Sequence, residues 1–175
     1  MLFRSMENGS PLEGKLENVQ YFHDKGIRYI TLTHSLSNHI SDSSYDENKQ
    51  WGGLSPFGQS LIEEMNNVGM MIDVSHVSDD AFYQTIDLSR VPVIASHSSL
   101  RHFTPDWERN MSDEMVKAIA KNGGVVQINF GSNFLINDNR VKDDSEEYIF
   151  ADVADVADHI DRVVSLTSIR QIGRA

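Results

Sequence analysis

Cysteine is absent from the 175 residues, so the chain can form no disulfide and can offer no thiolate to a metal. Any metal would therefore depend on histidine, aspartate and glutamate side chains. Basic residues are scarce: 15 Lys and Arg stand against 26 Asp and Glu, a formal net charge of −11 that argues against nucleic acid or an anionic membrane as partner. No apolar run approaches the roughly 20 residues of a membrane helix, and no signal-peptide pattern or phosphate-binding glycine motif occurs. These absences leave the compartment open.

Two short apolar runs, Met70–His76 and Val91–His97, are hydrophobic enough to be buried strands, and both end in Ser-His. Between them, Ser78 followed by two aspartates begins a predicted helix that continues to Ile86. A strand, a helix and a second strand of this kind form a βαβ unit with parallel strands. Because the carboxyl ends of such strands face one crevice, we expect His76 and His97 to point into a common site, and two converging imidazoles suggest a metal.

The rest of the chain continues the alternation of helix and strand. Further helices are expected over 10–25, 55–68, 112–122 and 148–166, and further strands before Glu7 and over 27–34 and 125–130. Gly26 is the expected end of the first helix, and the last should bury one apolar face: Ile149, Val153, Val156, Ile160 and Val164. Polar loops are expected over 35–54 and 138–147, and a loop as long as the first is usually functional or disordered.

This alternation predicts an α/β protein with a parallel sheet. Ligand-type residues follow several successive strands, which favours a (β/α)8 TIM-type barrel over a doubly wound sheet. Such a barrel would be incomplete here, since a whole one takes about 250 residues. Residues 1–5 and 171–175 read like translated sequencing adaptors, so we expect non-native ends around a partial hydrolase barrel over 6–170.

The candidate metal ligands are His76, His97 and Glu7, and each also has a plainer reading. A lone buried histidine at a strand end more often bonds to backbone than to metal, but two in equivalent positions favour ligation. Two cations close together need a bridging anion, and Glu7 could supply it. From spacing alone, a surface acid is the preferred interpretation of Glu7.

Two further residues could handle substrate. His34 could bind metal or stabilise developing charge, or it could be a solvated loop histidine; Arg109 could clamp a substrate carboxylate in a bidentate way, although most loop arginines do nothing so specific. Asp73, inside a strand, should pair with a neighbour. The remaining histidines are expected at the surface or in loops: His23, His39, His102 and His159.

Several stretches together, in order over 6–170, resemble the membrane (renal) dipeptidase family of zinc peptidases. These stretches are Glu7–Gly9, Gly26–His34, Gly53–Gly58, Glu64–Asn66, Gly69–Ser78, Pro92–Ser99, Arg109–Asn110 and Gly124–Phe130. The resemblance implies a (β/α)8 barrel with two zinc ions, a dipeptide substrate and a metal-bridging hydroxide. By this match Glu7 would bridge both metals and His76 and His97 would complete one of them. His34 would face the scissile bond, and Arg109 would bind the substrate carboxylate.

The family pattern also includes groups that this sequence lacks. These are a first-strand His-x-Asp and the aspartate of Gly-x-Asp-Phe-Asp-Gly, which the family is thought to use for proton transfer. The resemblance therefore implies a zinc dipeptidase that is inactive as this chain alone, and a homodimer is a further expectation. Two alternatives stay open: another amide or ester hydrolase on the same scaffold, and a non-catalytic metal- or peptide-binding relative.

Overall fold

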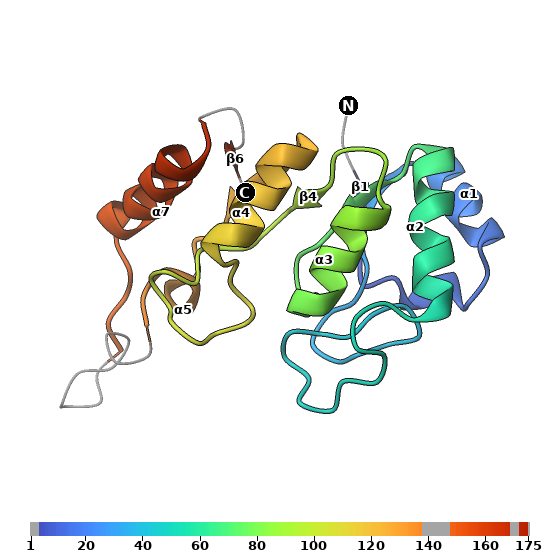
Figure 1. The fold of residues 1–175 in the computed structure, drawn as a ribbon, viewed down its shortest axis with the longest axis horizontal. Coiled ribbons are helices and arrows are strands. Elements are labelled where there is room, and N and C mark those ends of the chain that lie inside the picture. Colours follow the sequence, from blue (N-terminus) through green and yellow to red (C-terminus); the bar gives the residue numbers. More distant parts are fainter. Residues whose placement is uncertain (1–3, 138–147, 169–171, 175) are drawn as a thin grey trace. The chain divides into compact units, whose positions relative to one another are not determined.

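The computed structural model describes residues 4–137, 148–168 and 172–174, so the predicted loop over 138–147 lies outside the described residues. The chain divides into two compact units, residues 1–94 and 95–175. Both alternate parallel strands with helices, which confirms the predicted α/β class (Figure 1). None of the helices in these ranges is long and apolar enough to span a membrane.

The first unit is a parallel sheet in sequence order with helices packed beside one another. Its strands are β1 (Arg4–Glu7), β2 (Ile27–Thr31), β3 (Met71–Asp73) and β4 (Ile94–Ala95), the last of which runs into the second unit. Its helices are the 3-10 helix η1 (Ser10–Leu12), α1 (Glu17–Asp24), α2 (Pro56–Val68) and α3 (Asp79–Leu88). Helix α2 packs between α1 and α3 (Figure 1). Buried Ile30 and Ile72 are register partners in the sheet and contribute to the core beneath these helices.

Local sequence explains where these helices begin and end. Ser55 and Ser78 cap α2 and α3, each with its hydroxyl accepting a backbone N–H bond from the residue three positions on. Gly69 ends α2 in the left-handed conformation, at a φ of 82° that favours glycine. The helix predicted over 55–68 and the helix start predicted at Ser78 are confirmed.

The single helix predicted from Ser10 to Gly26 is wrong. The structure has η1, a turn and then α1, because Glu13 and Gly14 both take positive φ values, 53° and 69°, which a continuous helix excludes. The strands also prove shorter than the apolar runs suggested, with β3 and β4 ending at Asp73 and Ala95. As a result, the histidines lie in the turns after the strands rather than in them.

The second unit contains α4 (Asp113–Asn122), β5 (Val125–Ile128), α5 (Ser132–Leu135), α7 (Val153–Leu166) and β6 (Ile172–Arg174). Strands β5 and β6 are parallel, and α7 packs against α4 and β5. Arg4 and Ser5 lie in β1, and β6 falls within 171–175; that both ends are non-native stays a prediction.

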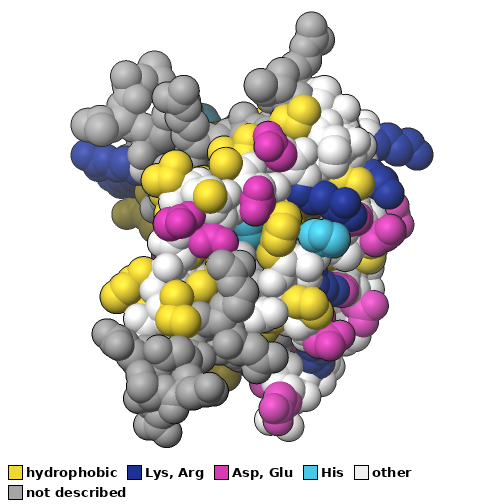
Figure 2. All heavy atoms as spheres, turned by 90° about the vertical axis from the view of Figure 1, so that its left-hand side faces the viewer, with side chains coloured by type: hydrophobic (Ala, Val, Ile, Leu, Met, Phe, Trp, Pro, Cys, Tyr) yellow, Lys and Arg dark blue, Asp and Glu magenta, His cyan; other side chains and the backbone are white. Residues whose placement is uncertain are grey.

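The predicted apolar face of the last helix is wrong. Asp152 caps α7 with a reciprocal bond to Asp155, so the helix starts five residues later than expected. Its buried residues are His159 and Val163, whereas Val153 is 84% exposed. Phe130, expected inside a strand, lies beyond the end of β5 and is 60% exposed. Figure 2 shows hydrophobic side chains at the surface on the side where α7 lies.

Candidate metal centre

The carboxyl ends of the first three strands are aligned by the sheet register. Thr31 at the end of β2 is the partner of both Glu7 in β1 and Asp73 in β3. His34 and His76 are each the third residue after this shared level of the sheet. The parallel register therefore brings Glu7, His34 and His76 to the same edge, as expected for ligand-type residues that follow successive parallel strands.

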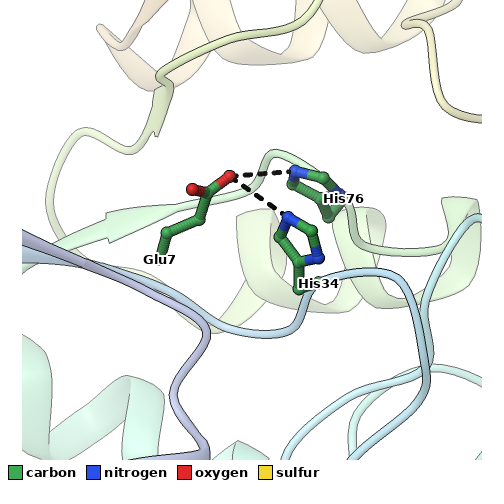
Figure 3. Close-up of side chains that lie close together, drawn as sticks. All are labelled: Glu7, His34 and His76. Atoms are coloured by element: carbon green, nitrogen blue, oxygen red, sulfur yellow. Dashed lines mark ion pairs between the residues drawn. The ribbon is translucent and has the colours of Figure 1, made fainter.

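The side chains of Glu7, His34 and His76 converge on one point and form a cluster (Figure 3). Glu7 Oε1 lies 3.3 Å from His76 Nε2 and 3.4 Å from His34 Nε2. The two imidazole rings stack with centroids 4.2 Å apart at an interplanar angle of 30°. One ligand atom from each residue lies within 4.8 Å of those of the other two. This group can hold a metal ion, and nitrogen and carboxylate donors are a set that zinc accepts.

The three residues differ in exposure, which suggests different tasks. The His76 side chain is 6% exposed, whereas those of His34 and Glu7 are 42% and 51% exposed. A buried ring is suited to a fixed ligand, and the more exposed His34 ring can also meet a substrate. Ser35 Oγ lies 2.8 Å from His34 Nδ1, which leaves Nε2 directed at the cluster.

Buried Asp73 supports the turn that carries His76. Its carboxylate accepts hydrogen bonds from Thr31 Oγ1 at 2.6 Å and from the Ser75 backbone N–H at 3.0 Å. This confirms the prediction that Asp73 pairs with a neighbour. His76 itself takes a φ of 71°, a left-handed conformation uncommon outside glycine, and its carbonyl accepts a bond from Ser44 N at 2.8 Å. The strained turn is thus held from two sides.

His97 and Arg109 belong to the second unit. Ser96 Oγ lies 2.7 Å from His97 Nδ1, the same arrangement that Ser35 makes with His34. The Arg109 guanidinium is buried, donates to His97 O at 2.7 Å and to Ser98 Oγ at 2.9 Å, and lies 5.0 Å from the Phe134 ring centroid. The structure therefore brings the side chains of Glu7, His34 and His76 together. Separately, Arg109 donates a hydrogen bond to the His97 backbone. The assigned roles of all five residues stay predictions.

Sequence reasoning missed the contribution of the loop over 35–54. Asp42 is fully buried, and its carboxylate accepts backbone N–H bonds from Gln50, Trp51 and Gly53. Burial alone would raise the pKa of Asp42, but these N–H groups outweigh it and lower the pKa. The loop is ordered around this carboxylate and reaches both histidines. Its density of Ser and Asp was the available signal, because such side chains often bond to nearby backbone.

The fold and this group together define an α/β protein with a metal-capable histidine and glutamate centre at the carboxyl ends of parallel strands. The family model for membrane dipeptidase, peptidase family M19, matches residues 1–175. The chain belongs to this family.

Individual relatives agree with this assignment. Dipeptidase 3 of Mus musculus is 34% identical over 96% of this chain, and an uncharacterized dipeptidase, C965.12, of Schizosaccharomyces pombe is 36% identical over 93%. The chain spans only 33% and 37% of their lengths. Among solved structures, an amidohydrolase from Pseudomonas aeruginosa is 29% identical with a TM-score of 0.82. The probable dipeptidase PvdM from the same organism is 26% identical with a TM-score of 0.88.

The two Pseudomonas structures also extend beyond this sequence. The matches cover 97% and 98% of this chain, but 48% and 56% of the two solved chains. Their similarity over nearly the whole sequence supports the α/β fold and is consistent with an incomplete TIM-type barrel.

Proposed function

We propose that the protein containing this chain is a zinc-dependent dipeptidase. The observation that carries the proposal is the convergence of His34 Nε2 and His76 Nε2 on one Glu7 oxygen, in a chain of the membrane dipeptidase family. Relatives named as dipeptidases support the reaction class. The donor set supports zinc, since no cysteine is available and imidazole with carboxylate suits this ion.

In this proposal Glu7, His76 and His97 hold metal. The position of His97 along the chain supports its inclusion. Ile94 is the register partner of Asp73, and His97 follows Ile94 by three residues, as His76 follows Asp73. Equivalent turns after parallel strands present equivalent side chains to one edge of a sheet. Glu7, at the matching level of β1, is the carboxylate that can bridge two cations.

When bound, a pair of zinc ions supplies a hydroxide at neutral pH for attack on the peptide carbonyl. His34, half exposed at the edge of the cluster, stabilises the charge that develops on the carbonyl oxygen. Arg109 binds the substrate's carboxylate, which limits the reaction to short peptides. The family pattern assigns proton transfer and the remaining ligands to residues that this sequence does not contain, so we expect the chain alone to be inactive.

The test is zinc content and hydrolysis measured together on the full-length protein. We expect about two zinc ions per chain and cleavage of a simple dipeptide. His76→Ala should lose zinc and activity together, while Glu17→Gln on α1 should change neither. Normal activity in His76→Ala would remove the proposed role, and a protein with no metal would support a non-catalytic relative.

A second candidate is another amide or ester hydrolase on the same scaffold. The similarity to an amidohydrolase from Pseudomonas aeruginosa favours it. Acylated amino acids and lactones, assayed beside a dipeptide under the same conditions, separate the two enzymes. Faster turnover of either compound than of any dipeptide would favour this second candidate.

A further inference from the structure

The segment Ser43–Tyr45 contacts the backbone of both histidines in the cluster. The Ser43 hydroxyl donates to the His34 carbonyl oxygen at 2.5 Å, and Ser44 N donates to the His76 carbonyl oxygen at 2.8 Å. Ser43 also forms an antiparallel bridge with Val77, directly after His76. One tripeptide thus fixes the two turns that carry the imidazoles.

This segment is itself firmly held. The neighbouring Asp42 carboxylate accepts three backbone N–H bonds, and the Asp42 backbone donates to Gly53 O at 2.9 Å and accepts from Ser78 N at 3.0 Å. The Tyr45 N–H donates to Ser43 Oγ at 3.2 Å. The backbone that carries Tyr45 is therefore already ordered, which lowers the entropic cost of using this segment to bind a ligand.

Tyr45 presents its ring beside the cluster. The centroid of its ring lies 5.9 Å from that of His76, at an interplanar angle of 47°. The ring contacts a nearly buried candidate ligand on one side, yet the residue remains 41% exposed. An aromatic face in this position is suited to packing against an apolar group that reaches the cluster.

We infer that Tyr45 is a specificity-determining residue, whose ring forms a wall for a large apolar side chain of the substrate beside the reacting carbonyl. The inference rests on the proposed dipeptidase function and deepens it. The wall formed by Tyr45 favours dipeptides with leucine-like or aromatic side chains over those made of glycine alone. The Tyr45 ring supplies contact area to such a side chain and has nothing to contact in Gly-Gly.

The test compares dipeptides in the full-length enzyme that contains this chain. Tyr45→Ala should lower kcat/KM for Leu-Gly or Gly-Leu about fivefold more than kcat/KM for Gly-Gly, mostly through KM. Tyr45→Phe should keep the wild-type preference, because the ring does the packing. Tyr83→Ala is the matched control: Tyr83 is also 41% exposed, lies on α3 and packs its ring against Phe82.

The outcomes separate this inference from the proposed function. If the wild type cleaves dipeptides and Tyr45→Ala keeps their ratio, the inference fails and the proposed function stands. A uniform loss on all dipeptides, accompanied by loss of zinc, would mean that Tyr45 only supports His76 and would also overturn the inference. If the wild type cleaves no dipeptide, both fail.

Discussion

His159 on α7 is bound by Leu100 on one side of its ring and by Leu135 on the other. Leu100 N donates to His159 Nδ1 at 3.1 Å, and Nε2 lies 3.0 Å from the Leu135 carbonyl oxygen. Since a backbone N–H can only donate, Nδ1 must accept, and the ring is neutral with its proton on Nε2. The fully buried imidazole therefore joins α7 to the segment after His97 and to the end of α5.

This arrangement predicts a pH dependence of stability. Burial lowers the pKa of His159, and nearby His102 lowers it further. The Leu135 carbonyl and the charges of Asp155 and Asp158 raise the pKa, but burial outweighs them. Because the pKa of His159 is lowered in the folded state, the neutral ring contributes fully to stability at pH values above its unfolded pKa of about 6.5. This contribution is lost as the pH falls from there through the folded pKa, because protonation of Nδ1 removes the acceptor for Leu100 N.

The measurement is the free energy of unfolding between pH 8 and pH 5 for the wild type and His159→Gln. We expect the variant to be less stable by about 1–3 kcal/mol at pH 7.5, with the difference shrinking below about pH 6.5. His23→Gln, a half-buried histidine on α1, should follow the wild-type profile. A difference that does not change with pH would contradict the assigned protonation state.

The sequence predicted most of the elements and two of the three members of the cluster as metal ligands. Capping serines located the starts of α2 and α3, and Gly69 located the end of α2, because these signals act within a few residues. The sequence predicts His76 as a ligand from its place after a strand and from family resemblance, and Glu7 through the resemblance; both roles stay predictions. The position of His34 leaves metal binding and substrate contact open, and the family resemblance assigns it to the substrate. Only the three-dimensional structure shows that its ring stacks on His76.

Other features could not be predicted, because they depend on contacts between distant residues. His159 was expected at the surface or in a loop, yet it lies on α7 and is buried between residues 59 and 24 positions away in the sequence. Asp42 is hydrogen-bonded to backbone 8–11 residues further on, a pairing that composition suggests but does not specify. Neither periodicity nor a local cap encodes such contacts.

Asp42→Asn should loosen the loop over 35–54. The amide keeps one acceptor oxygen and turns an N–H₂ group toward backbone N–H groups, so we expect a loss of about 2 kcal/mol locally. Limited trypsin digestion at Lys49, within this loop, should become several-fold faster. Asp87→Asn, an exposed acid on α3, is the control and should be cleaved at the wild-type rate. Equal resistance in Asp42→Asn would show that the carboxylate does not organise the loop.

Removal of metal should lower the thermal stability of the full-length protein. A metal that binds only the folded state stabilises it by mass action, about 2.7 kcal/mol when its free concentration is 100 times Kd. We expect a strong chelator to lower the Tm of the wild type by several degrees and excess zinc to restore it. In Glu7→Gln and His76→Ala the effect of the chelator should be small, whereas Glu17→Gln should respond as the wild type does. An unchanged Tm in the chelated wild type would argue against a tightly bound metal at Glu7 and His76.

Arg109→Lys tests recognition of the substrate carboxylate. Lysine keeps the positive charge but cannot donate to His97 O and Ser98 Oγ from one planar group, as the guanidinium does. We expect KM for a dipeptide to rise about tenfold and KM for the corresponding dipeptide amide, which has no carboxylate, to change much less. Because Arg109 also bonds to the His97 backbone, zinc content must be measured in parallel. Equal losses on the dipeptide and its amide, together with loss of zinc, would mean that Arg109 supports the turn at His97 and does not bind the substrate.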